Sequence, residues 1–353
     1  IGLLYHNGYV RQKLDPSGWQ QDGEVNLEPE AYAQLGLNLA MMETKPVLEK
    51  IGIDSGSPRE VSVGAYILHI KGKKPTLPLF LGTTNIPENT HEWDRGITSR
   101  LYDNGSGSRD YYRTIQFRVL AAVRRIVQQM GYDGSYHLNE GHGAFIALDM
   151  LEEGLSPDQV RDKLWLTTHT PEAAAFDYFK LSEVANALPN DLPKLLALTN
   201  EWHNSLPYIV NLGGVEHLGM AELAISFSRG INAVSEIHAG VSSGMPQFAG
   251  RKVEYATNGI HLPTWVHPAK ARIFEEQLNE PFENPGEFRR SEAIDDALFD
   301  EAHRQAQRGL FDLVRDRTGY QLDEGKMTIG FARRGATYKR ADLLLSNLEA
   351  LAG

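Results

Sequence analysis

The segment from 134 to 154 reads GSYHLNEGHGAFIALDMLEEG and joins an apolar run, a polar turn and a helical pattern. SYHL is a strand candidate, NEGH is polar, and the remainder carries apolar residues at helical spacing up to a glycine. A strand that passes through a polar turn into a helix is the repeating unit of α/β proteins. This segment therefore predicts an α/β fold with a mostly parallel sheet.

Three further segments repeat the same order. They read LWLTTHTPEAAAF (164–176), INAVSEIHAGV (231–241) and VEYATNGIHLPTW (253–265). In an open parallel sheet, ligands bind beyond the carboxyl ends of the strands, because helix N-termini and loop side chains converge there. We therefore predict that the polar residues after the four apolar runs line one crevice.

Other elements are predicted outside this repeat. The apolar runs at 61–70 and 76–82 predict two paired strands near a sheet edge, and 110–131 predicts an amphipathic helix that ends on a glycine. Residues 295–319 predict a second long helix. After it, the strand, loop and helix order starts again.

This order of elements predicts three parts. We expect a Rossmann-like domain over 1–260, a helical connector over 261–324, and the first strand, loop and helix of a second domain over 325–353.

Composition limits the functions that are open to the chain. The formal net charge of −11 over 353 residues argues against general binding to nucleic acid or to an anionic membrane surface. No apolar run approaches the roughly 20 residues that span a bilayer. The chain has no cysteine, which excludes disulfides and thiolate metal sites and fits a cytoplasmic location.

Two kinds of catalytic site find little support. The histidines in NEGH and SEIH lack the spaced partners that a zinc site needs, so we predict no metal. No serine lies in a nucleophile elbow, which argues against a Ser-His-Asp triad.

Asn139, Glu140 and His142 directly follow the first strand of the repeat. An amide and a carboxylate at this point could bind the hydroxyls of a polar substrate. Alternatively, Asn139 or Glu140 caps the next helix and His142 bonds a backbone carbonyl, which is the more usual role of such residues. The residues alone leave both interpretations open.

His169 and Asn258 follow two of the later strands. Pro171 ends the strand in TTHTP, which leaves His169 at its polar end as an acid, a base or a backbone contact. The alternative is a histidine fixed in a turn by its threonine neighbours. Asn258 belongs to TNG, which is a turn signal in its own right, and a turn is the simpler interpretation there.

The segment 328–340, TIGFARRGATYKR, predicts an anion site. Arginine offers paired planar donors and lysine a point charge, and the start of a helix adds backbone N–H groups that suit a phosphate. Arg333, Arg334 and Lys339 are the candidate ligands. A solvated basic surface is the alternative.

Taken together and in this order, several motifs resemble a known family. They are GYVRQKLDPSGWQ, DRGITSRLYDN, YHLNEGHGAF, TTHTP, INAVSEIH, TNGIHLPTW and GFARRGATYKR. The chain resembles the bacterial and archaeal branch of the α-glucan (glycogen, maltodextrin) phosphorylases over nearly its whole length.

The resemblance implies a GT-B type glycosyltransferase fold, with the active site between two Rossmann-like domains. It implies reversible phosphorolysis of terminal α-1,4-linked glucose to glucose 1-phosphate with retained anomeric configuration. The expected partners are therefore an α-1,4-glucan and inorganic phosphate, and a homo-oligomer stays open. The expected cofactor is pyridoxal phosphate, used for its phosphate group.

The same resemblance implies roles for the candidate residues. Asn139, Glu140 and His142 would line the donor cleft. His169 would approach the transferred glucose through its backbone carbonyl, and Asn258 would contact a sugar hydroxyl.

In the basic segment, Arg333, Arg334 and Lys339 would hold the substrate and cofactor phosphates. With His169, the resemblance makes Arg334 and Lys339 the expected catalytic residues.

Parts of the family pattern are missing or altered. The glycine-rich loop upstream of GYVRQ and the portion with the Schiff-base lysine are absent, so we expect a chain truncated at both ends and inactive alone. Phe117 follows Gln116 where the family has a glycine-containing stretch. Two alternatives stay open: a nucleotide-sugar glucosyltransferase of the glycogen synthase kind, and a noncatalytic glycan-binding remnant.

Overall fold

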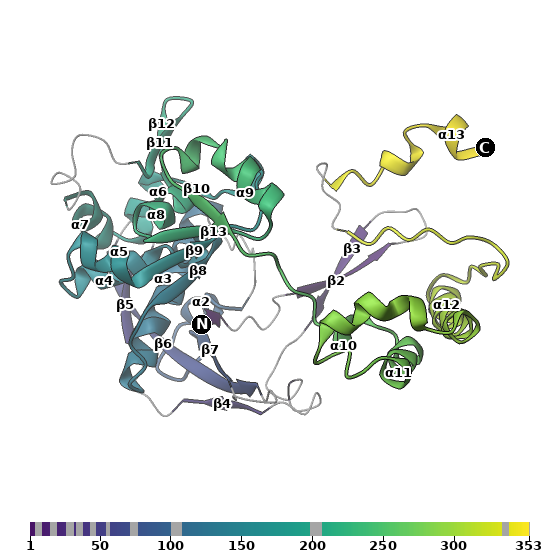
Figure 1. Ribbon diagram of the computed structural model, residues 1–353. Helices are drawn as coiled ribbons and strands as arrows, with labels where there is room; N and C mark the ends of the chain where they lie inside the picture. The colour runs from purple at the N-terminus through teal and green to yellow at the C-terminus, as the bar shows by residue number, and fades with distance from the viewer. Residues whose placement is uncertain are drawn as a thin grey trace. The chain divides into compact units, whose positions relative to one another are not determined.

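The computed structural model describes the chain except residues 4–8, 15–19, 26–31, 33–37, 43–46, 54–56, 71–76, 100–107, 198–206, 334–338 and 353. The chain forms two compact units, Ile1–Asn258 and Gly259–Gly353 (Figure 1). Each unit is described by itself below.

A mixed sheet forms one part of the first unit. Its strands are β1 (Gly2–Leu3), β4 (Leu39–Met41), β5 (Val47–Ile53), β6 (Ser57–Ile70) and β7 (Leu77–Thr83). β6 and β7 pair antiparallel from Gly64↔Thr83 to Ile70↔Leu77, so the predicted strand pair is confirmed. Each of the two strands lies one strand away from an edge of this sheet, as predicted. β1 pairs with β7, and β4 and β5 pair with successive stretches of β6, at Tyr66–Leu68 and Ser57–Val63.

A second sheet is wholly parallel and contains the four strands that the repeat predicted. They are β8 (Tyr136–Asn139), β9 (Leu164–Thr167), β13 (Gly230–Ala233) and β14 (Val253–Tyr255). Their order is β14-β13-β9-β8, with Leu138 opposite Leu166 and Leu166 opposite Ile231. These three side chains lie on one face and are buried, because successive side chains of a strand point to opposite faces. The α/β class is therefore confirmed.

Smaller strands complete the first unit. β10 (Tyr178–Lys180), β11 (Ile209–Leu212) and β12 (Val215–Gly219) form an antiparallel sheet in the order β10-β12-β11. β2 (Tyr9–Leu14) and β3 (Gln20–Val25) form an antiparallel pair.

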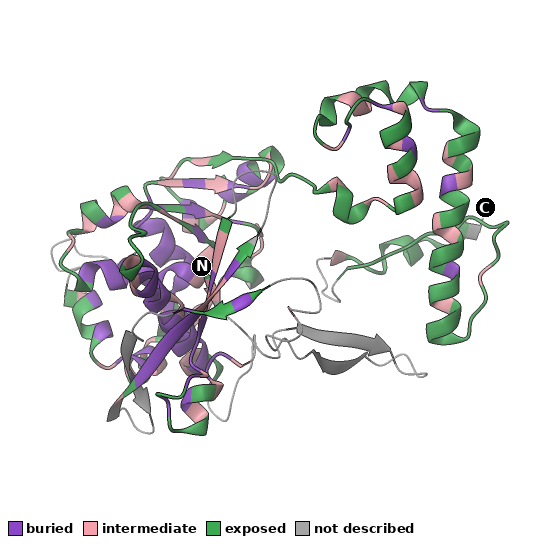
Figure 2. Ribbon diagram, turned by 90° about the horizontal axis from the view of Figure 1, so that it is seen from below, coloured by how far each residue is buried: buried purple, intermediate pink, exposed green. Residues whose placement is uncertain are grey.

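The predicted helix over 110–131 is confirmed as α3 (Arg109–Gln129), the main helix of the core. Gly131 follows it with φ +81°, a conformation that suits glycine after a helix. The other helices of the unit are α2 (Glu92–Gly96), α4 (Phe145–Glu152), α5 (Pro157–Lys163), α6 (Leu181–Ala187), α7 (Asp191–Ala197), α8 (Met220–Ser226) and α9 (Glu236–Ser243), with 3-10 turns η1 (Glu140–Gly143), η2 (Ala173–Ala175) and η3 (Pro246–Phe248). Figure 2 shows that the buried residues are concentrated in the first unit.

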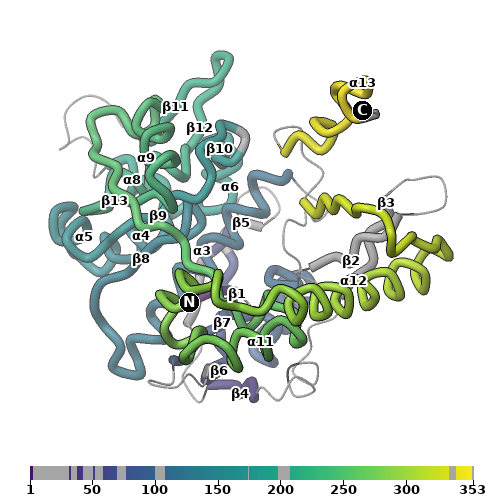
Figure 3. Tube along the Cα trace, turned by 45° about the vertical axis from the view of Figure 1, so that its right-hand side comes forward, coloured from purple at the N-terminus to yellow at the C-terminus, as the bar shows by residue number. Residues whose placement is uncertain are grey.

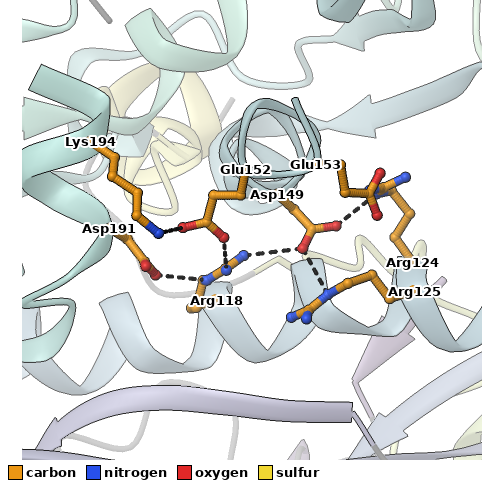
Figure 4. Close-up of polar contacts among 8 residues, drawn as sticks. All are labelled: Arg118, Arg124, Arg125, Asp149, Glu152, Glu153, Asp191 and Lys194. Carbon is orange, nitrogen blue, oxygen red and sulfur yellow. Dashed lines mark hydrogen bonds and ion pairs between the residues drawn. The ribbon is translucent and has the colours of Figure 1, made fainter. Parts of the chain in front are cut away.

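A buried cluster of charged side chains joins α3, α4 and α7 (Figure 4). Arg118, 2% exposed, donates to Asp149, Glu152 and Asp191 at 3.4, 2.6 and 3.1 Å. Asp149, also 2% exposed, accepts from Arg124 at 2.8 Å. Because α4 begins just after η1, this cluster anchors the segment that follows the end of β8.

The second unit is helical where the structure describes it. It contains α10 (Leu262–Trp265), α11 (Pro268–Gln277), η4 (Pro285–Ala293), α12 (Asp296–Thr318), η6 (Leu343–Leu345) and α13 (Leu348–Ala352). α11 and α12 lie side by side (Figure 3). The helix predicted over 295–319 is confirmed: Asp295 caps α12 by accepting from the Leu298 N–H at 3.0 Å, and Gly319 ends it with φ +74°.

The strand expected at the start of 325–353 is not formed over 327–333. A strand needs a neighbour for its backbone hydrogen bonds, and the described residues of this unit hold no other strand. The division into 1–260, 261–324 and 325–353 stays a prediction. Within the described ranges, no helix has both the length and the apolar content to cross a membrane.

Candidate functional site

The segments that follow the parallel strands are tied together at one edge of the sheet. The Thr168 N–H donates to the carbonyl of Asn232 at 2.9 Å, and the Asn258 N–H donates to the carbonyl of Val234 at 3.1 Å. These bonds continue the strand pairing past the ends of β9, β13 and β14. The polar residues that follow these strands therefore share one edge.

Glu140 connects the end of β8 to the end of β9. Its Oε1 accepts the N–H groups of His169 at 2.5 Å and of Thr170 at 3.1 Å. Burial raises the pKa of this carboxyl group, and the two backbone N–H groups act in the opposite direction. Glu140 has φ +56°, which is uncommon outside glycine and marks a backbone held by its surroundings.

The capping interpretation is wrong for Asn139 and Glu140. Neither the 3-10 turn η1 nor α4 has a side-chain cap, and the Glu140 carboxylate points instead to the segment after β9. The Asn139 side chain is exposed at the end of its strand.

Gly141 brings η1 against the start of α8. A Cβ atom at this position would lie 2.9 Å from Cβ of Met220 and 3.0 Å from its carbonyl carbon. Only glycine allows this approach without displacing the backbone. The turn η1, which carries Glu140 and His142, is therefore held against the start of α8.

His142 packs inside the unit beside the site. Its ring meets Phe117 edge-on, with centroids 5.1 Å apart, and it hydrogen-bonds the backbone of Asn139, as the structural alternative expected. Burial lowers the pKa of His142, Asp177 raises it and Arg113 lowers it. The net direction is downward, which favours the neutral imidazole at pH 7.

His169 is held by its backbone and exposes its side chain. Partial burial and then the charge of His137 lower the pKa of its ring. Asn258 is exposed at the end of the neighbouring segment.

Sequence reasoning did not assign His238 to this edge. Its N–H donates to Ser235 Oγ at 3.2 Å, and its Nδ1 accepts the N–H of Val234 at 3.3 Å. Its Nε2 is buried and has no partner among the described residues. Burial and then the charge of His169 lower its pKa. The sequence feature that could have indicated the place of His238 is Ser235 in SEIH, because serine is typical of an N-cap at the start of a helix.

The basic segment lies in the second unit. Arg333 is exposed and Lys339 is partly exposed, while Arg334 lies outside the described residues. The anion site predicted there stays a prediction. In the described part of the chain, no group of three or more His, Asp or Glu side chains could hold a metal ion.

Comparison with known proteins identifies relatives. No protein family model matches the chain. Over an alignment of 386 positions, the chain is 31% identical to the maltodextrin phosphorylase of Thermococcus litoralis. The alignment covers 99% of this chain and 44% of that protein. The chain is 28% identical to the glycogen phosphorylases of Aquifex aeolicus and Mycobacterium tuberculosis over 99% of this chain, covering 54% and 44% of those proteins. The chain thus spans about half the length of the curated relatives that it matches.

Proposed function

We propose that this chain, a homologue of the maltodextrin and glycogen phosphorylases of archaea and bacteria, forms part of an α-glucan phosphorylase. The reaction would transfer the terminal α-1,4-linked glucosyl unit of a glucan to inorganic phosphate and release glucose 1-phosphate with retained configuration. A cytoplasmic location is part of the proposal.

The observation that carries the proposal is the shared edge of β8, β9, β13 and β14. It presents two exposed side-chain amides, from Asn139 and Asn258, and amides both donate to and accept from sugar hydroxyls. This is the edge at which open parallel sheets bind their ligands. We propose that the first unit is the first Rossmann-like domain of a GT-B fold and that the second unit leads into the other domain.

Glu140 supports a role for the backbone of His169. Its carboxylate accepts the Thr170 N–H, which belongs to the same peptide group as the His169 carbonyl. Because that peptide is planar and trans, the carbonyl oxygen of His169 points away from Glu140. In this arrangement, the carbonyl dipole would face the glucosyl unit as positive charge develops on its ring.

The residues of the basic segment fit a phosphate. No carboxylate occurs between Phe331 and Arg340, and Arg333, Arg334 and Lys339 supply paired donors and a point charge. We propose that they hold the phosphate of pyridoxal phosphate and the substrate phosphate. When bound, the cofactor would supply its phosphate group beside the substrate phosphate. The chain's own cations would bind and orient the two anions.

One assay tests the proposal and its rival. The full-length protein that contains this chain is incubated with maltodextrin and phosphate in the presence of pyridoxal phosphate, and glucose 1-phosphate is measured. We expect its release without any nucleotide-sugar. Glucosyl transfer only from a nucleotide-sugar would support a synthase instead. Glucan binding without either reaction would support a noncatalytic glycan-binding protein.

A further inference from the structure

One face of the parallel sheet is open among the described residues. The strands β8, β9, β13 and β14 follow one another across the sheet in chain order, so right-handed connections place their helices over one face only. That face buries Leu138, Leu166 and Ile231. Because parallel sheets are usually covered on both faces, the opposite face is a candidate binding surface.

The side chains of this open face are exposed or partly exposed. They are His137, Asn139, Trp165, Thr167, Asn232 and Glu254.

Trp165 is the aromatic residue of the open face and is 40% exposed. Its indole lies against Gly230 of the neighbouring strand, where a Cβ atom would collide with Cζ3 and Cε3 of the ring. The ring fits there only because Gly230 has no side chain. The indole is therefore held across β13 with part of its surface open to solvent.

A hydrogen-bonded row of polar side chains crosses the open face beside Trp165. The Thr167 hydroxyl donates to Asn232 Oδ1 at 2.9 Å and lies 2.6 Å from His137 Nε2. Because the single hydroxyl proton of Thr167 goes to Asn232, His137 must donate from Nε2. In the neutral ring, Nδ1 of the exposed His137 is then an acceptor with no partner among the described residues.

These groups suit a neutral sugar. The apolar face of an indole packs against the C–H face of a glucosyl unit. The sugar hydroxyls would donate to Nδ1 of His137 and exchange hydrogen bonds with the exposed amide of Asn139. Glu254, the carboxylate of this face, is paired with Lys252 at 2.6 Å, so it adds no uncompensated charge.

The open face is continuous with the candidate glucan site. Asn139 and Thr167 are the last residues of β8 and β9, so the face begins at the edge that carries that site. Side chains on one face of a strand are two residues apart, which places Trp165 about 7 Å along β9 from Thr167. A glucan that extends from the edge along β9 would therefore reach the indole.

We propose that the open face binds a linear stretch of the α-glucan, with a glucosyl unit stacked on Trp165 and its hydroxyls directed to His137 and Asn139. The assignment rests on the proposed function, because it extends the same substrate from the edge of the sheet onto its face.

Isothermal titration of the chain with maltoheptaose tests the surface. Trp165→Ala should weaken binding about fivefold or more, the usual effect of losing an aromatic contact. The matched control is Trp265→Ala, which removes a 77% exposed indole from the second unit and should leave the affinity unchanged. Unchanged affinity in Trp165→Ala, or an equal loss in Trp265→Ala, would overturn the proposal.

Two further variants test the surface without removing the indole. Gly230→Ala places a Cβ atom where the ring lies, so it should displace the indole and weaken maltoheptaose binding. His137→Ala removes the unpaired acceptor and should weaken binding several-fold. Circular dichroism and a thermal melt establish that each variant is folded, and His137→Ala decides the question if the other two do not fold.

Hydroxyl-radical footprinting of the full-length protein tests whether the face is open there. Oxidation of Trp165 is measured by mass spectrometry with and without maltoheptaose. Trp165 should be oxidised in the free protein and protected by the glucan. Protection without glucan would place another segment or a second copy on this face and would overturn the proposal.

Failure of the proposed function gives a different result. The full-length protein would then release no glucose 1-phosphate, while maltoheptaose would still bind the chain through Trp165. If both proposals hold, Trp165→Ala raises the KM for maltoheptaose several-fold and leaves kcat unchanged. Release of glucose 1-phosphate with an unchanged KM in Trp165→Ala would count against the open face alone.

Discussion

Glu140 shows how a single residue can be recognised from sequence while its role is not. The pattern after β8 marked this position as polar and adjacent to a helix, which made capping the usual expectation. In the structure, the side chain crosses to the next strand and accepts two backbone N–H groups. Its partners lie 29 and 30 residues away, so no local rule could have named them.

Two substitutions at Glu140 distinguish the effect of its acceptor oxygen from the effect of its charge. Glu140→Ala leaves the N–H groups of His169 and Thr170 without their partner and should lower the free energy of unfolding by about 2 kcal/mol. Glu140→Gln keeps an acceptor oxygen and should cost less than about 1 kcal/mol. Urea unfolding of both variants and the wild type measures the difference. Equal losses would mean that the two hydrogen bonds contribute little to stability.

The raised pKa of Glu140 predicts a pH dependence. Its folded pKa lies above the ordinary value of 4.5, so between the two values the folded state binds more protons than the unfolded state. This contribution to stability is therefore fully present below pH 4.5 and is lost as pH rises through the raised pKa. The stability of the wild type relative to Glu140→Gln should then increase as pH falls.

The comparison with Glu140→Gln is necessary because other groups titrate too. Burial lowers the pKa values of His142, His169 and His238, which makes the folded state less stable as pH falls below about 6.5. Both proteins share these histidines, so their contributions cancel in the difference. A relative stability that is constant with pH would contradict the pKa shift of Glu140.

At the scale of elements, the spacing of apolar residues predicted the helices and strands, because their formation depends on residues that are near one another in the sequence. All four strands of the parallel sheet, α3 and α12 were found from apolar spacing and turn residues. The strand order β14-β13-β9-β8 and the small antiparallel sheet were not predicted. They depend on pairing between segments tens of residues apart, which spacing within one segment does not encode.

The charged cluster of α3, α4 and α7 was also missed, because an arginine on a helical pattern normally indicates a solvated face. Here Asp149 is 2% exposed and forms ion pairs with Arg118, Arg124 and Arg125. Asp149→Ala should lower the free energy of unfolding by about 3 to 5 kcal/mol, because buried guanidinium groups lose a counter-charge.

Chemical denaturation of Asp149→Ala measures this loss. The control is Asp162→Ala, which removes an exposed carboxylate 3.9 Å from Arg229 and should not change stability measurably. A similar loss in both variants would indicate that burial does not distinguish the cluster from a surface ion pair.

At the scale of the whole molecule, the two units differ in how much core each contains. α3 buries 14 side chains in the core of the first unit, among them Ile115, Val119 and Ile126. The second unit has a small cluster of Ile273, Leu278, Ile294 and Ala302. Spacing within α12 predicted a helix correctly, but it could not show that only Ala302 and Phe311 are buried on it.

This difference predicts unequal protection of the long helices. Backbone amides of α12 should exchange with solvent at an opening free energy about 2 kcal/mol or more below that of α3, because few apolar contacts hold α12 in place. Hydrogen exchange followed by mass spectrometry on the chain measures both helices at once. Ile273→Ala removes apolar volume from the small cluster and should speed exchange in α11 and α12 while α3 keeps its protection. Equal protection of α3 and α12 in the wild type would show that the second unit is stabilised by more than its own small cluster.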